Sequence, residues 1–329
     1  MSFVIEVSDL SRVFRMRLQK AGKRRFFARA AYKDVTAVRN LNFSIEAGEK
    51  VAFIGPNGAG KSTTLRMLSG LLAPTSGTAQ VCGFVPWKQT RALSRHIGLV
   101  FGQKTHLWPA LSVRDNFDLL ARVYDLAPQD YQEQRDKLIE MFALQEFLGQ
   151  QARTLSLGQR MRSDIAAALL HKPKVLFLDE PTIGLDVTAK ALLRDHLRHL
   201  EQSFETTLLL TSHDTDDIER ICERVIVIDH GEKLLDTPLD ALQGQYAKHK
   251  TLKLTTEQEN PVFLHPHTQV EAQSAHQLCL KVDVSQVSME SVVAQCLQQF
   301  QIRDISIENV PLEEIIRTIY EGQASALWH

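Results

Sequence analysis

The chain has 329 residues, and 38 Lys and Arg against 39 Asp and Glu give it a formal net charge of −1. This balance does not favour bulk binding to nucleic acid, and the lack of a run of about 18 apolar residues or of a charged-then-apolar leader argues against a membrane span and against secretion. The length predicts one large and one small domain. Four scattered cysteines without a Cys-x-x-Cys pair are expected to be reduced core residues of a cytosolic protein: Cys82, Cys222, Cys279 and Cys296.

The first distinctive segment is basic. Between Arg12 and Lys33 there are nine basic residues and no acid, and removing their charges leaves a net of −10 for the rest of the chain. Aromatic residues are interleaved at Phe26, Phe27 and Tyr32. Such a segment can lie against anionic lipid headgroups, where each charge contributes about 1 kcal/mol, or it can be a solvated loop. The basic residues are Arg12, Arg15, Arg17, Lys20, Lys23, Arg24, Arg25, Arg29 and Lys33.

A glycine-rich loop follows an apolar stretch at 51–54 that predicts a buried strand. The loop ends in Gly-Lys-Ser and leads into a helical pattern that stops at Gly70, as in a phosphate-binding loop. Backbone N–H groups and the helix N-terminus would bind phosphates there. Lys61 would reach the β and γ phosphates, and the Ser62 hydroxyl would coordinate Mg2+. The loop residues are Gly55, Pro56, Asn57, Gly58, Ala59, Gly60, Lys61, Ser62 and Thr63.

Two more apolar runs, 175–178 and 208–210, predict buried strands that end in polar residues. Such strand ends lie at the ligand-binding edge of an open α/β sheet. Asp179 is therefore expected to hold Mg2+ through water, and Glu180 to orient and polarise the attacking water. His213 is placed to donate a hydrogen bond to the γ-phosphate.

A capped helix start is predicted at residues 155–159. Ser156 is a good N-cap, and Gln159, three residues later, completes a capping box. The helical pattern runs through residues 165–170 until Pro173 stops it. Free N–H groups at a capped start form an anion site, so Ser156 is a candidate phosphate contact.

These segments resemble, in order and spacing, the motifs of ATP-binding-cassette (ABC) ATPases over about residues 3–240. The motifs are residues 55–63, Gln103, residues 155–159, residues 179–182, residues 184–186 and His213. The resemblance implies an α/β fold: a P-loop NTPase of the ABC type, with a RecA-like core, an antiparallel β subdomain and a helical subdomain at about 104–170. The basic segment at about 15–33 is then an insertion between the first two strands, because most members cross this stretch with a short turn.

The resemblance also implies a homodimer with ATP and Mg2+ held between two subunits, and a separate transmembrane permease as partner. Gln103 would contact Mg2+ and water and relay the nucleotide state to that permease. Ser156 and Gly158 would touch the γ-phosphate of the opposing subunit, beside Gln159, and Asp186 would lie in the loop that crosses the dimer seam. The implied catalytic residues are Glu180, His213, Lys61 and Gln103, and the implied metal-site residues are Ser62, Gln103 and Asp179.

Two positions depart from the family pattern. Leu157 stands where glycine is usual, and its side chain would narrow the approach to phosphate. At the adenine end, Phe14 is the best match to the stacking aromatic residue, where tyrosine is commoner. Tyr32 is a competing candidate, and packing of Phe14 in the core is a third interpretation.

Residues 104–117 lead into the helical subdomain, whose cleft in the family accepts a short helix of the permease. Trp108 and Leu111 are candidate walls of that cleft or core residues. Beyond Pro238, strands are predicted at 251–256, 277–284 and 303–310, and a last helix begins near Pro311. Val292, Val293, Cys296, Leu297 and Phe300 form one helical stripe, and His265, His267 and His276 fall in a predicted polar loop. Residues 241–329 therefore predict a small α+β domain, suited to dimer support or regulation.

The predicted function is the ATPase subunit of a prokaryotic ABC exporter at the cytoplasmic face of the inner (plasma) membrane. Three resemblances favour export: the Leu157 form of the cap, the Trp108-Pro109 region, and a C-terminal domain similar to that of drug and antibiotic exporters. An importer ATPase has the same motifs and stays an alternative, as does a slow regulatory ATP-binding switch. A translation-factor or DNA-repair cassette would need a second cassette in tandem or a long coiled coil, and the sequence predicts neither. For the basic segment, an acidic patch on the permease is an alternative to lipid.

Overall fold

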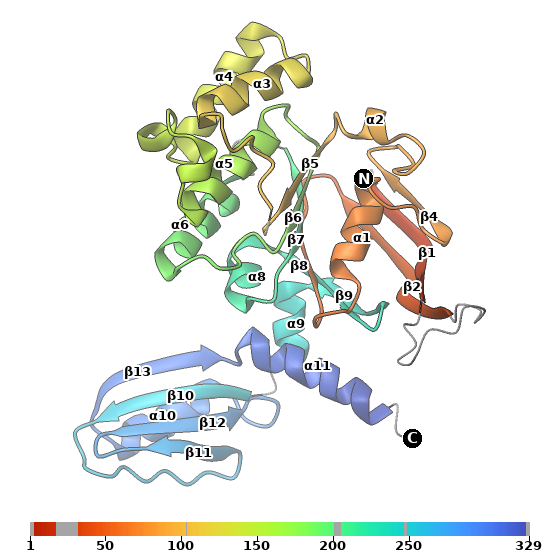
Figure 1. Ribbon diagram of the computed structural model, residues 1–329. Coiled ribbons are helices and arrows are strands. Elements are labelled where there is room, and N and C mark those ends of the chain that lie inside the picture. The colour runs from red at the N-terminus through yellow and green to blue at the C-terminus, as the bar shows by residue number, and fades with distance from the viewer. Residues whose placement is uncertain (1–2, 18–31, 103, 201–204, 247–248, 327–329) are drawn as a thin grey trace, which may run out of the picture. The chain divides into compact units, whose positions relative to one another are not determined.

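The structure is a computed structural model that describes residues 3–17, 32–102, 104–200, 205–246 and 249–326. It divides into two compact units, Met1–Thr237 and Pro238–His329, here the N-terminal and C-terminal units (Figure 1). The sequence analysis places the domain boundary at 240. Within the described residues, no helix is long and apolar enough to cross a bilayer.

A six-stranded sheet in the order β5-β6-β7-β3-β8-β9 carries the glycine-rich loop and the two predicted acids of the N-terminal unit at its strand ends. Strands β5, β6, β7, β3 and β8 pair in parallel. Every residue of β3 and β7 is buried, which explains why these strands read as continuous apolar runs. The strands are β3 Lys50–Ile54, β5 Ile97–Phe101, β6 Val175–Asp179, β7 Thr207–Thr211, β8 Arg224–Asp229 and β9 Glu232–Pro238.

An antiparallel sheet in the order β2-β1-β4 forms a second layer. Its strands are β1 Phe3–Arg17, β2 Tyr32–Glu46 and β4 Ser76–Val81. One apolar core joins this sheet, helix α1 Lys61–Leu68 and the inner strands of the six-stranded sheet. Strands β1 and β2 pair out to Arg17 and Tyr32, so the ends of the predicted basic insertion belong to a hairpin. Residues 18–31 lie outside the described residues.

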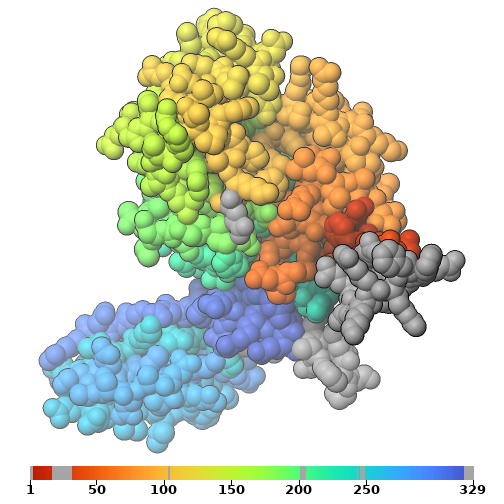
Figure 2. All heavy atoms as spheres, in the orientation of Figure 1, coloured from red at the N-terminus to blue at the C-terminus, as the bar shows by residue number. Residues whose placement is uncertain are grey.

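The remaining helices of the N-terminal unit follow the parallel strands or form a separate lobe. Helices α3, α4 and α5 make that lobe, and Figure 2 shows α3 and α4 in yellow, projecting from the surface. Ser112 caps α3, and Ser156 and Gln159 form the capping box of α5 that the sequence predicted. The helices are α2 Thr90–Leu93, α3 Val113–Val123, α4 Pro128–Met141, the 3-10 turns Gln145–Phe147 and Ala152–Thr154, α5 Leu157–Leu169, α6 Val187–Arg198 and α8 Thr215–Ile221.

The C-terminal unit is an antiparallel sheet in the order β11-β12-β10-β13, with α10 packed on one face. Alternating residues of β10 and β12 bury Leu252, Leu254, Leu278 and Leu280 against α10. The elements are α9 Leu239–Tyr246, β10 His249–Thr256, β11 Thr268–Gln273, β12 Gln277–Asp283, α10 Met289–Gln299, β13 Ile302–Asn309 and α11 Leu312–Ala326.

Three details of the structure differ from the sequence prediction, two of them in the C-terminal unit. The predicted polar loop that holds the histidines is interrupted by strand β11, whose alternation is hidden because all but one of its residues are exposed. Leu297, placed on the buried stripe of α10, is 59% exposed. Cys222 and Cys296 are buried, whereas Cys82 and Cys279 are only partly so.

A matched pair of substitutions tests the core of the C-terminal unit. Leu254 is 1% exposed and Leu264 is 88% exposed. Leu254→Ala should lower the free energy of unfolding by about 2–5 kcal/mol, because it removes apolar contacts and leaves a cavity. Leu264→Ala should stay within about 0.5 kcal/mol of the unchanged protein. Differential scanning calorimetry distinguishes them, and equal shifts of the unfolding transition would contradict the assignment of this core.

Candidate functional site

The loop between β3 and α1 has the backbone needed to surround an anion. Gly58 and Gly60 have φ of 87° and 105°, a region that favours glycine. A Cβ atom on Gly60 would lie 2.4 Å from the Ala37 carbonyl oxygen, so a larger residue does not fit. The positive φ angles and the close packing therefore fix the loop in a tight bend, the kind of backbone that lets N–H groups converge on phosphate.

Lys61, the first residue of α1, is 5% exposed and donates to carbonyl oxygens of its own loop. Its Nζ lies 2.6 Å from the Gly55 oxygen and 3.3 Å from the Pro56 oxygen. Burial lowers the pKa of Lys61, while the nearby carboxylates of Glu180 and Asp179 act in the opposite direction. An anionic ligand in the loop would favour the protonated amine still further, so the site is prepared for phosphate.

Asp179, at the end of β6, is hydrogen-bonded to the start of α1 and to the end of β7. Its Oδ1 accepts hydrogen bonds from the Ser62 hydroxyl at 3.0 Å and from the Thr211 hydroxyl at 2.7 Å. A hydroxyl oxygen and a carboxylate oxygen that lie this close together are ligands of the kind that Mg2+ prefers. The residues present therefore fit a magnesium ion, which Ser62 and Asp179 would hold. Gln103, the third predicted metal residue, lies outside the described residues.

Glu180 follows directly and sits in a strained turn. Its φ of 53° is unusual for a non-glycine residue. Two contacts fix this turn: the Glu180 N–H donates to the Thr211 carbonyl at 3.0 Å and is within 3.1 Å of the Thr211 hydroxyl. On the other side, a Cβ atom on Gly102 would lie 2.0 Å from the Glu180 carbonyl oxygen. The strain is thus maintained by tight packing.

His213 lies beside this carboxylate, with its Nδ1 3.8 Å from Glu180 Oε1. The histidine side chain is 59% exposed and that of Glu180 22% exposed. A cavity of about 500 Å³ opens next to them, and its walls are Ser62, Arg66, Leu71, Phe101, Gly102, Lys104, Asp179 and Glu180. The edge of the sheet at the carboxyl ends of the strands therefore offers space for a ligand beside Glu180 and His213.

Thr211 is a residue of this site that sequence analysis missed. It is fully buried, donates to Asp179 and accepts from the Glu180 N–H, so it fixes both acids. A signal was present, because Thr211 is the polar last residue of the predicted strand that delivers His213. Only the pairing of β6 with β7 shows which carboxylate it reaches.

The capped start of α5 is not part of this cluster. Ser156 is exposed, and its side chain bonds only within the capping box among the described contacts. Helix α5 packs on β5, α3, α4 and α6, whereas α1 packs on β2, β4 and β6. Figure 1 shows the two helices on either side of the strands β6 and β7. The structure thus brings Lys61, Ser62, Asp179, Glu180 and His213 together, and places Ser156 and Gly158 elsewhere.

The start of α5 instead contacts the loop that carries Asp186. A Cβ atom on Gly184 would lie 3.2 Å from Leu157 Cδ2, and one on Gly158 would lie 2.9 Å from Ala189 Cβ. Asp186 is exposed and caps α6 by accepting from the Ala189 N–H at 2.8 Å. Leu157 therefore fills space against Gly184.

Both candidate adenine-stacking rings lie on the β1–β2 hairpin, each beside a guanidinium. The Arg12 group lies 4.7 Å from the centre of the Phe14 ring, and the Arg15 group 4.6 Å from that of Tyr32. Phe14 is half-buried within β1, not beyond its end, and Tyr32 is 51% exposed. Phe14 and Tyr32 therefore both remain candidates for stacking on adenine.

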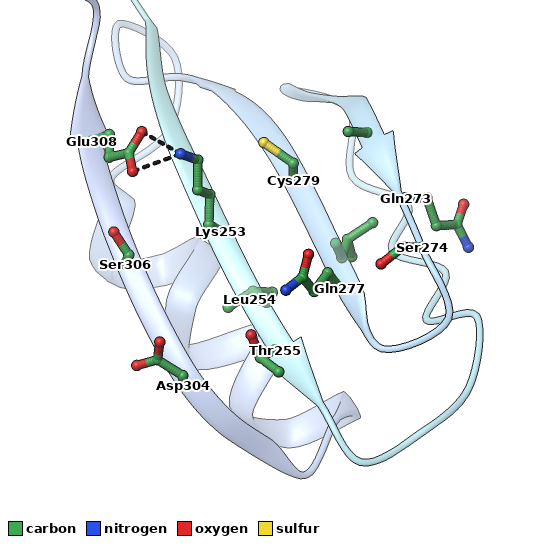
Figure 3. A pocket seen from close by; sticks show the side chains of 12 residues that line it. Lys253, Leu254, Thr255, Gln273, Ser274, Gln277, Cys279, Asp304, Ser306 and Glu308 are labelled. Carbon is green, nitrogen blue, oxygen red and sulfur yellow. Dashed lines mark hydrogen bonds and ion pairs between the residues drawn. The ribbon is translucent and has the colours of Figure 1, made fainter.

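A separate hollow lies in the C-terminal unit, on the face of the sheet opposite α10. Figure 3 shows the side chains of Lys253, Thr255 and Cys279 along this face. Lys253 is paired with Glu308 at 2.7 Å, and the thiol of Cys279 contacts the Glu271 carboxylate at 3.8 Å. These polar groups satisfy one another across neighbouring strands, and the hollow has no phosphate-binding loop.

Comparison with known proteins agrees with a phosphate-binding site, because the similar proteins are ATP-binding proteins. A family model described as ABC transporter matches residues 38–183. The linearmycin resistance ATP-binding protein LnrL of Bacillus subtilis is 32% identical over 287 residues, which are 86% of this chain and 92% of that protein. A Nod factor export ATP-binding protein I of Cupriavidus metallidurans is 40% identical over 209 residues, 63% of this chain and 68% of that protein.

Solved structures of other proteins resemble a large part of the fold. A dimeric ATP-binding cassette in a post-hydrolysis state, bound to ADP and Pi, matches with a TM-score of 0.59 and 26% identity over 71% of this chain and 98% of that chain. CbiO1 of Clostridium perfringens, part of an ABC transporter complex, matches with a TM-score of 0.61 and 26% identity over 74% of this chain and 92% of that chain.

A pair of Thr→Val substitutions on one strand tests the role of Thr211. Thr211→Val keeps the shape but removes the hydroxyl from Asp179 and Glu180, and a lost buried hydrogen bond of about 1.4 kcal/mol corresponds to a roughly tenfold lower kcat for ATP hydrolysis. Thr207→Val makes the same change at the other end of β7, where the hydroxyl accepts from the Gly48 N–H at 2.9 Å. It should keep kcat, and equal loss in both variants would remove the specific role of Thr211.

Proposed function

Because the chain belongs to the family of ABC transporter ATP-binding proteins, we propose that it is the ATP-hydrolysing subunit of an exporter. Members of this family are ATPases that act in transport. In this proposal, ATP binding and hydrolysis in a dimer of the chain drive movement of a substrate through a separate membrane permease.

The observation that carries the choice of export is the extent of one similarity. The relative named for linearmycin resistance is similar over 86% of the chain, a length that must include much of the C-terminal unit as well as the cassette. Another relative is named for Nod factor export. Since import and export cassettes share their catalytic motifs, the C-terminal unit is the more informative part. An importer ATPase is the second candidate.

The site suggests a division of roles. Lys61 and the loop N–H groups would bind the triphosphate, and Mg2+ held by Ser62 and Asp179 would neutralise charge on it. Glu180 would accept a hydrogen bond from the attacking water and orient it, while His213 would donate to the γ-phosphate. The hydroxyls of Ser62 and Thr211 on Asp179, and the tight turn at Glu180, support this arrangement because they hold both acids before any ligand binds.

A second copy of the chain would complete the site. Ser156 and Gly158, at the start of α5, lie on another element than the phosphate loop, and the Ser156 hydroxyl and the first-turn Gly158 N–H suit an anion. A two-fold dimer would bring α5 of one subunit to the phosphate loop of the other, with Asp186 at the seam. The dimeric cassette among the similar structures supports this assembly.

The permease would dock near the helical lobe. Trp108 is 45% exposed at the lobe, and Leu71 is 60% exposed at the mouth of the carboxylate cavity. Apolar side chains exposed beside a site that senses nucleotide suit a partner helix. Leu111 is half-buried and contributes less surface. Docking of this kind would hold the protein peripherally at the cytoplasmic face of the membrane.

Glu180→Gln tests hydrolysis and dimerisation together. The amide keeps the shape but cannot act as a base, so kcat should fall by about 100- to 10,000-fold. ATP should still bind, and because it is not hydrolysed it should hold two chains together. Light scattering in Mg-ATP should report a dimer for Glu180→Gln and a monomer without nucleotide.

Two outcomes would contradict the proposal. An unchanged single-turnover rate in Glu180→Gln would remove this residue from catalysis. Slow hydrolysis by the unchanged protein that rises in Leu157→Gly would favour the regulatory switch, because glycine opens the approach to phosphate.

A second proposal concerns the basic hairpin of β1 and β2. Arg15 and Arg17 lie at its described end, and five more basic residues follow between them and Tyr32 in the sequence. We propose that this end contacts anionic lipid headgroups close to the permease, where five charges at about 1 kcal/mol each give measurable binding.

Vesicle flotation tests this proposal without the permease. A variant with Gln at Lys20, Lys23, Arg24, Arg25 and Arg29 should lose binding to phosphatidylserine vesicles. A control with Gln at five exposed basic residues elsewhere should keep it: Arg91, Arg95, Arg114, Arg122 and Lys172. Equal recovery of both variants would rule out the lipid contact and leave an acidic patch on the permease or a solvated loop.

A further inference from the structure

A buried carboxylate outside the predicted motifs connects the segments of the catalytic site. Asp217, on α8, is fully buried. Its Oδ1 accepts from Arg194 Nε at 2.6 Å, and its Oδ2 accepts from the Ser212 hydroxyl at 2.7 Å and from the Thr182 hydroxyl. A buried charge of this kind persists only when it is paired and fully hydrogen-bonded.

Each of its partners belongs to a different functional segment. Thr182 lies two residues after Glu180, and Ser212 immediately precedes His213. Arg194 lies on α6, the helix that Asp186 caps. One carboxylate group thus fixes the Glu180 loop, the His213 loop and the helix behind the predicted dimer seam to one another.

A second acid strengthens the same connection. Asp214 Oδ2 lies 2.9 Å from a terminal nitrogen of Arg194 and 2.7 Å from Lys190 Nζ, both on α6. Asp214 also caps α8 through the Asp216 N–H. Asp216 Oδ2 also lies 3.3 Å from Arg194. Helix α8, which follows His213, is therefore joined to α6 by three carboxylates, and Arg194 is only 7% exposed between them.

From this geometry we propose that Asp217 is a positioning residue for ATP hydrolysis, which holds Glu180 and His213 in register through Thr182 and Ser212. The inference rests on the proposed function. The Glu180–His213 separation of 3.8 Å depends on two loops from different strands, and Asp217 contacts both of them, in addition to the hydrogen bonds of Thr211. Because the carboxylate touches neither residue directly, it should affect kcat and leave nucleotide binding nearly unchanged.

The N-terminal unit contains a matched network that serves as control. Arg224, at the start of β8, is paired with Asp236 at 2.8 Å and with Glu49 at 3.0 Å. These residues lie at the opposite, amino-terminal end of β3 and β8 and touch none of the catalytic segments. Asp236→Asn therefore removes one carboxylate charge from a comparable network without acting on Glu180 or His213.

The experiment measures kcat and KM for ATP in the full-length protein. Asp217→Asn keeps the shape but weakens all three hydrogen bonds, so kcat should fall at least about tenfold, with KM within about twofold. Ser212→Ala removes the hydrogen bond to Asp217 and the bond that its hydroxyl accepts from the Asp214 N–H, but it leaves the Arg194–Asp217 pair. In this variant kcat should therefore fall by a smaller factor. Asp236→Asn should keep the kcat of the unchanged protein.

A double-mutant cycle with His213→Ala separates positioning from general destabilisation. If Asp217 acts partly through His213, the double variant should lose less activity than the product of the two separate losses. Wild-type kcat in Asp217→Asn, or a double loss equal to the product, would overturn the inference. If Asp217→Asn does not fold, unchanged kcat in Ser212→Ala overturns it. Absence of hydrolysis by the unchanged protein would instead refute the proposed function.

Discussion

The hydrogen bonds that Asp179 accepts from Ser62 and Thr211 organise the whole site. They connect the end of β6 with the start of α1, which follows β3, and with the end of β7. Parallel pairing of these strands brings their carboxyl ends to one edge. Because Thr211 also accepts from the Glu180 N–H, the two acids that are proposed to bind the metal and to orient water are held by the same strand end. A shift of β7 against β6 would misplace both.

In the proposed function, a phosphate loop, two acids and a histidine form only half of a nucleotide site. A cavity opens beside the acids, and the capped start of α5 lies in another part of the same unit. The fold therefore separates the two halves, and two copies related by a two-fold axis would reunite them. Within one chain, the loop that carries Asp186 packs against Leu157 at the start of α5.

The sequence predicts this site well because its signals are local. A glycine loop between a strand and a helix, polar residues at the ends of apolar runs, and Ser156 with Gln159 can each be recognised without knowing the tertiary structure. Thr211 and Asp217 were missed because their roles depend on strand order and on burial of α8. Strand β11 was missed for a related reason, since an exposed edge strand lacks an apolar alternation.

The most direct test of the shared site mixes two inactive variants. Lys61→Ala removes the phosphate-loop charge, whereas Ser156→Asp keeps a good N-cap but sets a carboxylate against the γ-phosphate. Each variant alone should fail to hydrolyse ATP. A mixed dimer contains one site with an intact loop from one chain and an intact cap from the other, so the account predicts that mixing restores hydrolysis. A mixture as inactive as its components, or full activity of Ser156→Asp alone, would contradict it.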